Sequence, residues 1–208
     1  MACRAGAPAS SRAFRHAGTQ LLAAAMPDVA AKCMEAYFAA RQREGGAPAK
    51  PMVVLAARIY GAFGRVSDVE RLLAMLDNPA ACDGDGDGAG DGDGAAPPQA
   101  LAALVQAYAV RQDVTGARST LRMLADDMQV QDSGSACAIP RVACEAVVDM
   151  YLRMNDFASA CEFATSACEE WRYRPSQVPH TRPHVALCFA AASRAWCRPF
   201  ARVSTAHV

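Results

Sequence analysis

Three stretches of the chain share one pattern of apolar and polar positions. They are residues 51–76, 99–124 and 142–167. Aligned without gaps, they bring Tyr60, Tyr108 and Tyr151 together. The apolar residues up to each tyrosine recur at helical spacing, a short polar break follows, and a second apolar stripe begins after the break. Each stretch therefore predicts two helices joined by a tight turn.

The position nine residues after each tyrosine is taken by Val69, Ala117 and Ala160. We expect this position where the two antiparallel helices approach most closely, because a bulky side chain would be excluded there. Neither helix of a hairpin can bury its apolar face alone, so the hairpins must stack on one another. The pattern predicts an all-α fold, a short right-handed α-solenoid of helix-turn-helix repeats.

Weaker copies flank the three clear ones. Residues 11–44 give a degenerate repeat if Val29 is aligned with Val69, and residues 183–197 look like the first helix of a truncated repeat. The clear repeats extend over residues 51–78, 99–128 and 142–171. Residues 79–98 are rich in Asp and Gly and cannot hold a core, so they predict a solvated low-complexity loop inserted between repeats.

The stretch YGAFGRVSDVERLLAML resembles a pentatricopeptide repeat. The residues that carry the likeness are Tyr60, Gly64, Arg65, Val66, Asp68, Val69, Met75 and Leu76. The later copies repeat it at Tyr108, Val114, Ala117, Met123 and Leu124, and less well at Tyr151, Asn155, Phe157 and Ala160. The tetratricopeptide family is the nearest competitor. Its small mid-helix residue would fall at Ala57, Val105 and Val148, two of which are too large for it.

Pentatricopeptide proteins mostly bind single-stranded RNA in organelles, and they read about one base per repeat through a polar residue of the first helix. The corresponding residues here are Val54, Ala102 and Glu145. Two of them cannot hydrogen-bond a base, and the third is an anion facing a polyanion. The resemblance therefore implies a helical-repeat fold and an organelle RNA context, and we assign these three residues no base-reading role.

The formal net charge of zero hides an uneven distribution along the chain. All 21 acidic residues lie between residues 28 and 170, whereas residues 1–27 and 171–208 carry arginines and no acid. Any polyanion should therefore meet the termini rather than the acidic middle.

The basic C-terminal segment, residues 172–208, and Trp171 before it supply the predicted RNA-binding residues. Two aromatic side chains alternate with two arginines at residues 171–174, a combination that stacks on unpaired bases and contacts phosphates. The full set is Trp171, Arg172, Tyr173, Arg174, Arg182, Arg194, Arg198 and Arg202. The alternative is that the two aromatic residues close the third clear hairpin and the arginines are simply exposed.

Residues 1–27 have the composition of an organelle-targeting segment, with Arg, Ala and Ser but no acid. They also fit an ordinary Ala-rich first helix, and both interpretations can hold together. From this segment we expect a mitochondrial protein. No apolar run is long enough for a transmembrane helix, so we expect no membrane insertion.

No catalytic motif is present in the sequence, and we predict neither an enzyme nor a cofactor. The Asp/Gly loop lacks the glutamate that closes a calcium loop, since Gly94 stands at that position. His180, His184 and Cys188 have a ligand-like spacing, but Pro183 interrupts any helix joining them, so no metal site is predicted. The nine cysteines form no CxxC pair, and we expect free, mostly buried thiols.

These observations favour a non-catalytic scaffold in a mitochondrial RNA–protein assembly, a mitoribosomal subunit or an RNA-processing factor. In this hypothesis the basic termini touch RNA, ribosomal RNA in the first case, while the body holds neighbouring protein subunits. The alternative is a protein-only adaptor or accessory subunit of a mitochondrial protein complex.

Overall fold

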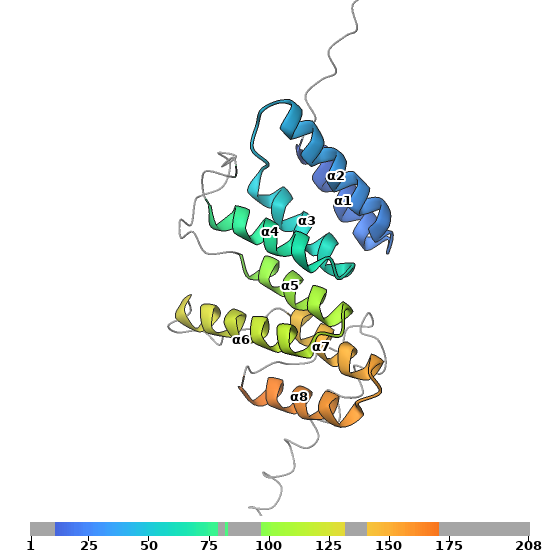
Figure 1. Cartoon of the computed structure of the whole chain (residues 1–208), viewed down its shortest axis with the longest axis vertical. Helices are drawn as coiled ribbons and strands as arrows, with labels where there is room; N and C mark the ends of the chain where they lie inside the picture. The colour runs from blue at the N-terminus through green and yellow to red at the C-terminus, as the bar shows by residue number, and fades with distance from the viewer. Residues whose placement is uncertain (1–10, 79–81, 83–96, 132–140, 171–208) are drawn as a thin grey trace, which may run out of the picture. The chain divides into compact units, whose positions relative to one another are not determined.

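Eight α-helices make up the part of the chain that the computed structural model describes, which is residues 11–78, 82, 97–131 and 141–170 (Figure 1). They are α1 Ser11–Ala23, α2 Pro27–Arg43, α3 Lys50–Ala62, α4 Val66–Asp77, α5 Pro98–Val110, α6 Val114–Gln131, α7 Arg141–Arg153 and α8 Phe157–Glu170. These residues contain no β-strand, so the prediction of an all-α fold is confirmed for them.

The helices pair into four hairpins of matching dimensions. The first helix of each hairpin (α1, α3, α5 and α7) has 13 residues. Three residues then separate it from the second helix in every case. Tyr60, Tyr108 and Tyr151 occupy the same place in α3, α5 and α7, so the alignment made from the sequence matches the observed helix boundaries of these three hairpins.

One backbone turn closes all four hairpins. Its central residue is Ala25, Gly64, Gln112 or Asn155, with φ of 54°, 68°, 61° and 58° respectively. The following residue donates its N–H to the carbonyl five residues back, at 2.9–3.1 Å, and the central residue donates to the carbonyl three residues back. These two bonds define the Schellman motif, which satisfies carbonyls left unpaired at the helix end.

The first hairpin corrects the sequence alignment by one residue. The expectation placed Val29 opposite Val69, but Val29 is 43% exposed and Ala30 is fully buried, as Val69 is. The Ala30 N–H bonds the carbonyl of Met26 just as the Val69 N–H bonds the carbonyl of Arg65. Ala30 is therefore the equivalent residue.

Acidic caps start two of the second helices. The Oδ1 atom of Asp113 accepts the Gly116 N–H at 2.9 Å at the start of α6, and Oδ1 of Asp156 accepts the Ser159 N–H at 3.0 Å at the start of α8. These bonds satisfy N–H groups that have no partner within the helix. Hydrogen bonds from the side chain and the backbone N–H of Ser159 hold the pKa of Asp156 below its usual value.

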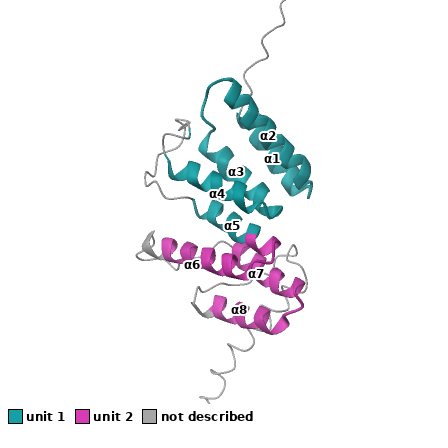
Figure 2. Ribbon diagram, in the orientation of Figure 1, with its two compact units in different colours: residues 1–107 teal, residues 108–208 magenta. Residues whose placement is uncertain are grey.

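Two compact units divide the chain, residues 1–107 and 108–208, with the boundary inside α5 (Figure 2). In the first unit, α3 packs against α1, α2 and α4, and α1 packs against α2. Tyr37 is fully buried there, and its Oη atom accepts the N–H of Ala49 at 3.0 Å, which fixes the linker into α3. A Cβ on Gly61 would lie 2.5 Å from the carbonyl oxygen of Ala103, so the backbones of α3 and α5 meet closely at this point.

In the second unit α7 packs against both α6 and α8. Ala117 and Ala160 are fully buried, as expected for the small position of each hairpin. Cys144 is buried as well, and burial raises the pKa of its thiol to about 12.

The cysteines depart from expectation. All five that the structure describes are free, but only Cys144 is buried, and Cys161 is exposed. The sequence prediction of mostly buried thiols is therefore wrong for this set. The reason is local: Cys161 lies on the outer face of α8, one residue after the buried Ala160.

Candidate nucleic-acid interface

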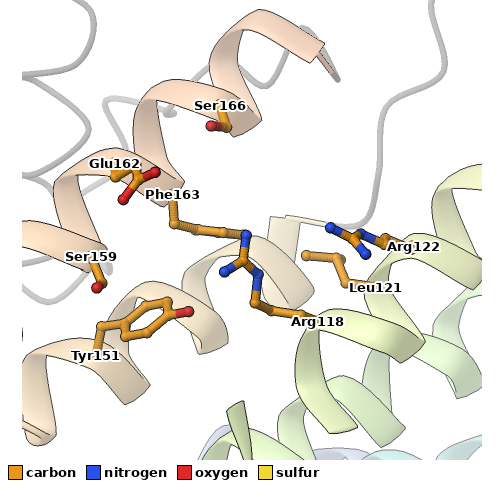
Figure 3. Close-up of a pocket in the computed structure, with 8 residues that line it drawn as sticks. All are labelled: Arg118, Leu121, Arg122, Tyr151, Ser159, Glu162, Phe163 and Ser166. Atoms are coloured by element: carbon orange, nitrogen blue, oxygen red, sulfur yellow. The ribbon is translucent and has the colours of Figure 1, made fainter. Parts of the chain in front are cut away.

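A shallow cleft of about 100 Å³ lies in the second unit, where α6 and α8 flank α7 (Figure 3). It is lined by Arg118, Leu121, Arg122, Tyr151, Ser159, Glu162, Phe163 and Ser166. Its floor is apolar and largely inaccessible to solvent, because Leu121, Tyr151 and Phe163 are each at most 7% exposed. The rings of Tyr151 and Phe163 are 6.5 Å apart between centroids.

The rim of the cleft is polar. Arg118 and Arg122 stand one helical turn apart on α6 and are exposed, while Ser159, Glu162 and Ser166 come from α8. Figure 3 shows the Arg118 side chain reaching from α6 toward Tyr151 and Phe163. Neither arginine forms an ion pair with any residue that the structure describes.

Two uncompensated guanidinium groups at (i, i+4) spacing repel each other and favour a bound anion. The hydroxyls of Ser159 and Ser166 supply further donors beside them, and Glu162 is the single carboxylate on the rim. The arrangement suits an oxyanion such as a phosphate, which an arginine fork matches in geometry.

Helix α7, by contrast, carries only paired charges. On α7, Arg141 Nε lies 2.5 Å from Glu145 Oε1, and Arg153 pairs with Asp149. Each pair joins residues one turn apart on the same helix. Each acidic residue of α7 therefore forms an ion pair with an arginine of the same helix. Neither arginine of α7 is left uncompensated to bind an anion.

The first unit exposes basic side chains on its own first helices. Arg12, Arg15 and His16 are exposed on α1, and Arg58 is exposed on α3. Within the described part of the chain none of the three arginines forms an ion pair. The acid-free N-terminal stretch thus places two of its arginines on an accessible helix face.

Arg65, unlike these arginines, forms ion pairs with other residues of the chain. Its guanidinium lies 2.9 Å from Glu35 Oε1 on α2 and 2.7 Å from Asp68 Oδ2 on α4. It also sits 4.4 Å from the ring centroid of Tyr60. These contacts join α2 to the α3–α4 turn, so the charge of this arginine is already engaged within the protein.

The three positions equivalent to base-reading residues are poorly placed for that task. Ala102 is 4% exposed, Val54 is half-buried, and Glu145 is engaged by Arg141. That these three residues read no base stays a prediction.

The eight residues predicted to bind RNA lie outside the described residues; they are Trp171, Arg172, Tyr173, Arg174, Arg182, Arg194, Arg198 and Arg202. Residues 83–96 of the predicted Asp/Gly loop and the His180/His184/Cys188 group also lie outside them, whereas Pro98, the last residue of that predicted loop, is the first residue of α5. The structure adds Arg58, Arg118 and Arg122, which sequence reasoning missed. For the last two, the (i, i+4) spacing of two arginines on one predicted helix was the available signal.

None of the helices in the described part of the chain combines the length and the apolar character that a membrane span requires. No model of a known protein family matches the chain, and no curated protein is found to be similar to it.

Proposed function

We propose that this chain is a non-catalytic, pentatricopeptide-like scaffold in a mitochondrial RNA–protein assembly, as a ribosomal subunit or an RNA-processing factor. The observation that carries the proposal is the set of four hairpins with equal first helices and one common turn. Repeated hairpins of this kind stack into a right-handed α-solenoid, whose long surface suits a scaffold better than a single catalytic pocket.

The RNA part of the proposal rests on uncompensated arginines. Arg118 and Arg122 line the cleft of the second unit, and Arg12 and Arg15 are exposed on α1. Phosphates supply most of the affinity of proteins for nucleic acids, through cations of this kind. The arginines and aromatic residues of segment 171–202 extend the proposed contact.

The test is binding of single-stranded RNA by the full chain across a salt series, with helix content followed by circular dichroism. Replacing both Arg118 and Arg122 with Gln should lower the slope of log affinity against log salt by roughly 0.7 for each phosphate that the variant no longer neutralises. Replacing Arg172, Arg174, Arg198 and Arg202 with Gln should lower it further.

A matched control removes the same number of charges elsewhere. Arg43 and Arg71 are exposed on α2 and α4, outside the cleft, and their change to Gln should leave the slope close to that of the parent. Equal losses in the control and the cleft variant would mean that only net charge matters.

The competing function is a protein-only adaptor in a mitochondrial complex. The same salt series separates the two functions, because an apolar peptide groove does not weaken steeply with ionic strength. Absence of RNA binding by the parent chain, alone and in its native assembly, would decide for the adaptor. Mitochondrial targeting has its own test: residues 1–27 fused to a fluorescent protein should direct it to mitochondria.

A further inference from the structure

Glu162 is the one residue on the rim of the cleft that phosphate binding does not explain. It is exposed on α8 and stands between Ser159 and Ser166, at spacings of three and four residues that place all three on one face of the helix. In the view of Figure 3, the Arg118 side chain lies between Glu162 on one side and Arg122 on the other. A carboxylate in this place repels the phosphate that the two arginines attract.

The charge of Glu162 is not used within the cleft. Among the described residues, no ion pair joins it to Arg118 or to Arg122. Both of its carboxylate oxygens can therefore accept hydrogen bonds from a bound molecule. A ligand that brings a hydrogen-bond donor to Glu162, as well as a phosphate to the arginines, would turn the repulsion into a favourable contact.

The floor of the cleft restricts which part of a nucleotide can bind there. The rings of Tyr151 and Phe163 are at most 7% exposed, so they offer no open face on which a base could stack. The contact is then with the sugar and the phosphate, which are the same for every base. The donor that meets Glu162 must accordingly belong to the sugar.

The sugar hydroxyl nearest to a phosphate in RNA is the 2′-hydroxyl, on the carbon next to the one that carries the phosphate ester. It is a hydrogen-bond donor, and DNA lacks it. We propose that Glu162 is the specificity-determining residue of the cleft: Arg118 and Arg122 bind a phosphate of single-stranded RNA, and the Glu162 carboxylate accepts a hydrogen bond from the neighbouring 2′-hydroxyl. This proposal rests on the RNA binding proposed above and adds to it the selection of RNA over DNA, without preference for base sequence.

The test compares oligouridylate with oligodeoxyuridylate of the same length, both bound to the full chain at one salt concentration. The ribose form should bind roughly tenfold more tightly, a modest factor for a hydrogen bond to a charged group because Glu162 is exposed. The 2′-O-methyl form has lost the donor and should bind as weakly as the deoxy form. Uracil carries no amino group, so the difference cannot come from a base amine that meets the carboxylate.

The variant Glu162→Ala should bring the ratio of the two dissociation constants to about one, because the acceptor is gone. Both oligonucleotides carry the same charge, so the ratio is insensitive to the general gain in affinity that removal of an acid produces. The control is Asp127→Ala, which removes an exposed carboxylate of α6 that does not line the cleft and should leave the ratio unchanged. Circular dichroism follows the helix content of each variant. If Glu162→Ala does not fold, Glu162→Gln should still lower the ratio roughly twofold or more, since an uncharged amide is the weaker acceptor.

The outcomes separate this inference from the proposed function. Equal binding of the two oligonucleotides by the parent would overturn the inference and leave RNA binding in place. So would a ratio that survives in the folded Glu162 variants, or one that the Asp127 control also abolishes. A parent chain that binds neither oligonucleotide would overturn both proposals.

Discussion

Adding one methyl group at Gly61 should destabilise the protein, although alanine is the better helix former. The new Cβ would lie 2.5 Å from the Ala103 carbonyl oxygen, 3.1 Å from its carbonyl carbon and 3.2 Å from its Cα. All three are backbone atoms, so no side-chain rotation relieves the clash. Helices α3 and α5 would have to separate by about 1 Å to restore ordinary contact distances.

The magnitude follows from two opposing terms. Overpacking of a tight contact costs roughly 1–3 kcal/mol, and the gain in helix propensity from Gly to Ala returns about 0.5–1 kcal/mol. The net loss should be about 1–2 kcal/mol, which lowers the melting temperature of a chain of this size by roughly 2–8 °C. Urea unfolding followed by circular dichroism measures the change in the free energy of unfolding, provided that the dependence of this free energy on urea concentration is the same in the variant and the parent.

Gly18→Ala is the matched control. Gly18 also lies inside a helix of the first unit, and its Cβ would approach the Cε atom of Met34 at 2.9 Å and the Cδ2 atom of Leu55 at 3.1 Å. These are the free ends of side chains that can rotate away, so this variant should be as stable as the parent or slightly more stable. If Gly61→Ala unfolds at the same urea concentration as Gly18→Ala, then α3 and α5 do not meet as described.

Three further predictions concern the turns, the caps and the buried thiol. Ala25→Gly should stabilise the protein by about 0.5–1 kcal/mol, because a non-glycine residue is strained at φ of 54°, whereas Gly64→Ala at φ of 68° should destabilise it by about 1 kcal/mol in the same urea assay. Asp113→Ala should cost about 0.5–2 kcal/mol by removing the cap of α6, and Asp113→Ser should recover most of the loss. Burial raises the pKa of Cys144 from 9.0 to about 12, so the unfolded thiol ionises first and stability should fall as the pH rises from 9 toward 12. Cys144→Ala should flatten that fall, and a profile identical to that of the parent would contradict the assignment.

Much of the hairpin architecture could be read from the sequence because its signals are local. The polar pairs Gly64–Arg65, Gln112–Asp113 and Asn155–Asp156 mark three of the four turns, and each places a residue that tolerates positive φ, or a helix cap, where the turn needs one. In these three hairpins the tyrosine spacing then fixed the boundaries of both helices.

The alignment fails at the first hairpin because this hairpin lacks those markers. Leu21 stands where the others have tyrosine, and Ala25 and Met26 form a turn without glycine, asparagine or a capping acid. With no local signal, only an apolar match remains, and Val29 is a more apolar partner for Val69 than Ala30 is. The neighbouring helices bury Ala30 and leave Val29 exposed, so Ala30 is the residue equivalent to Val69.

The arginine cleft could not be predicted for a different reason. Arg118, Arg122 and Leu121 come from one helix, but the rest of the apolar floor is Tyr151 of α7 and Phe163 of α8, more than 25 residues further on. Sequence spacing places the two arginines on one face; only packing shows that this face borders a hollow.

The distribution of paired and unpaired charge gives the strongest reason to test RNA before protein partners. The acids on α7 are each engaged by an arginine one turn away, and Arg65 is engaged by Glu35 and Asp68. An arginine whose charge is already paired with a carboxylate contributes less to phosphate binding than an unpaired one. Those that remain uncompensated among the described residues include Arg118 and Arg122, and these two lie side by side along one helix. Two like charges on adjacent turns of a helix repel each other by roughly 0.2–0.5 kcal/mol. The RNA contact that we propose would offset this repulsion, so the variant that replaces Arg118 and Arg122 is the first to test.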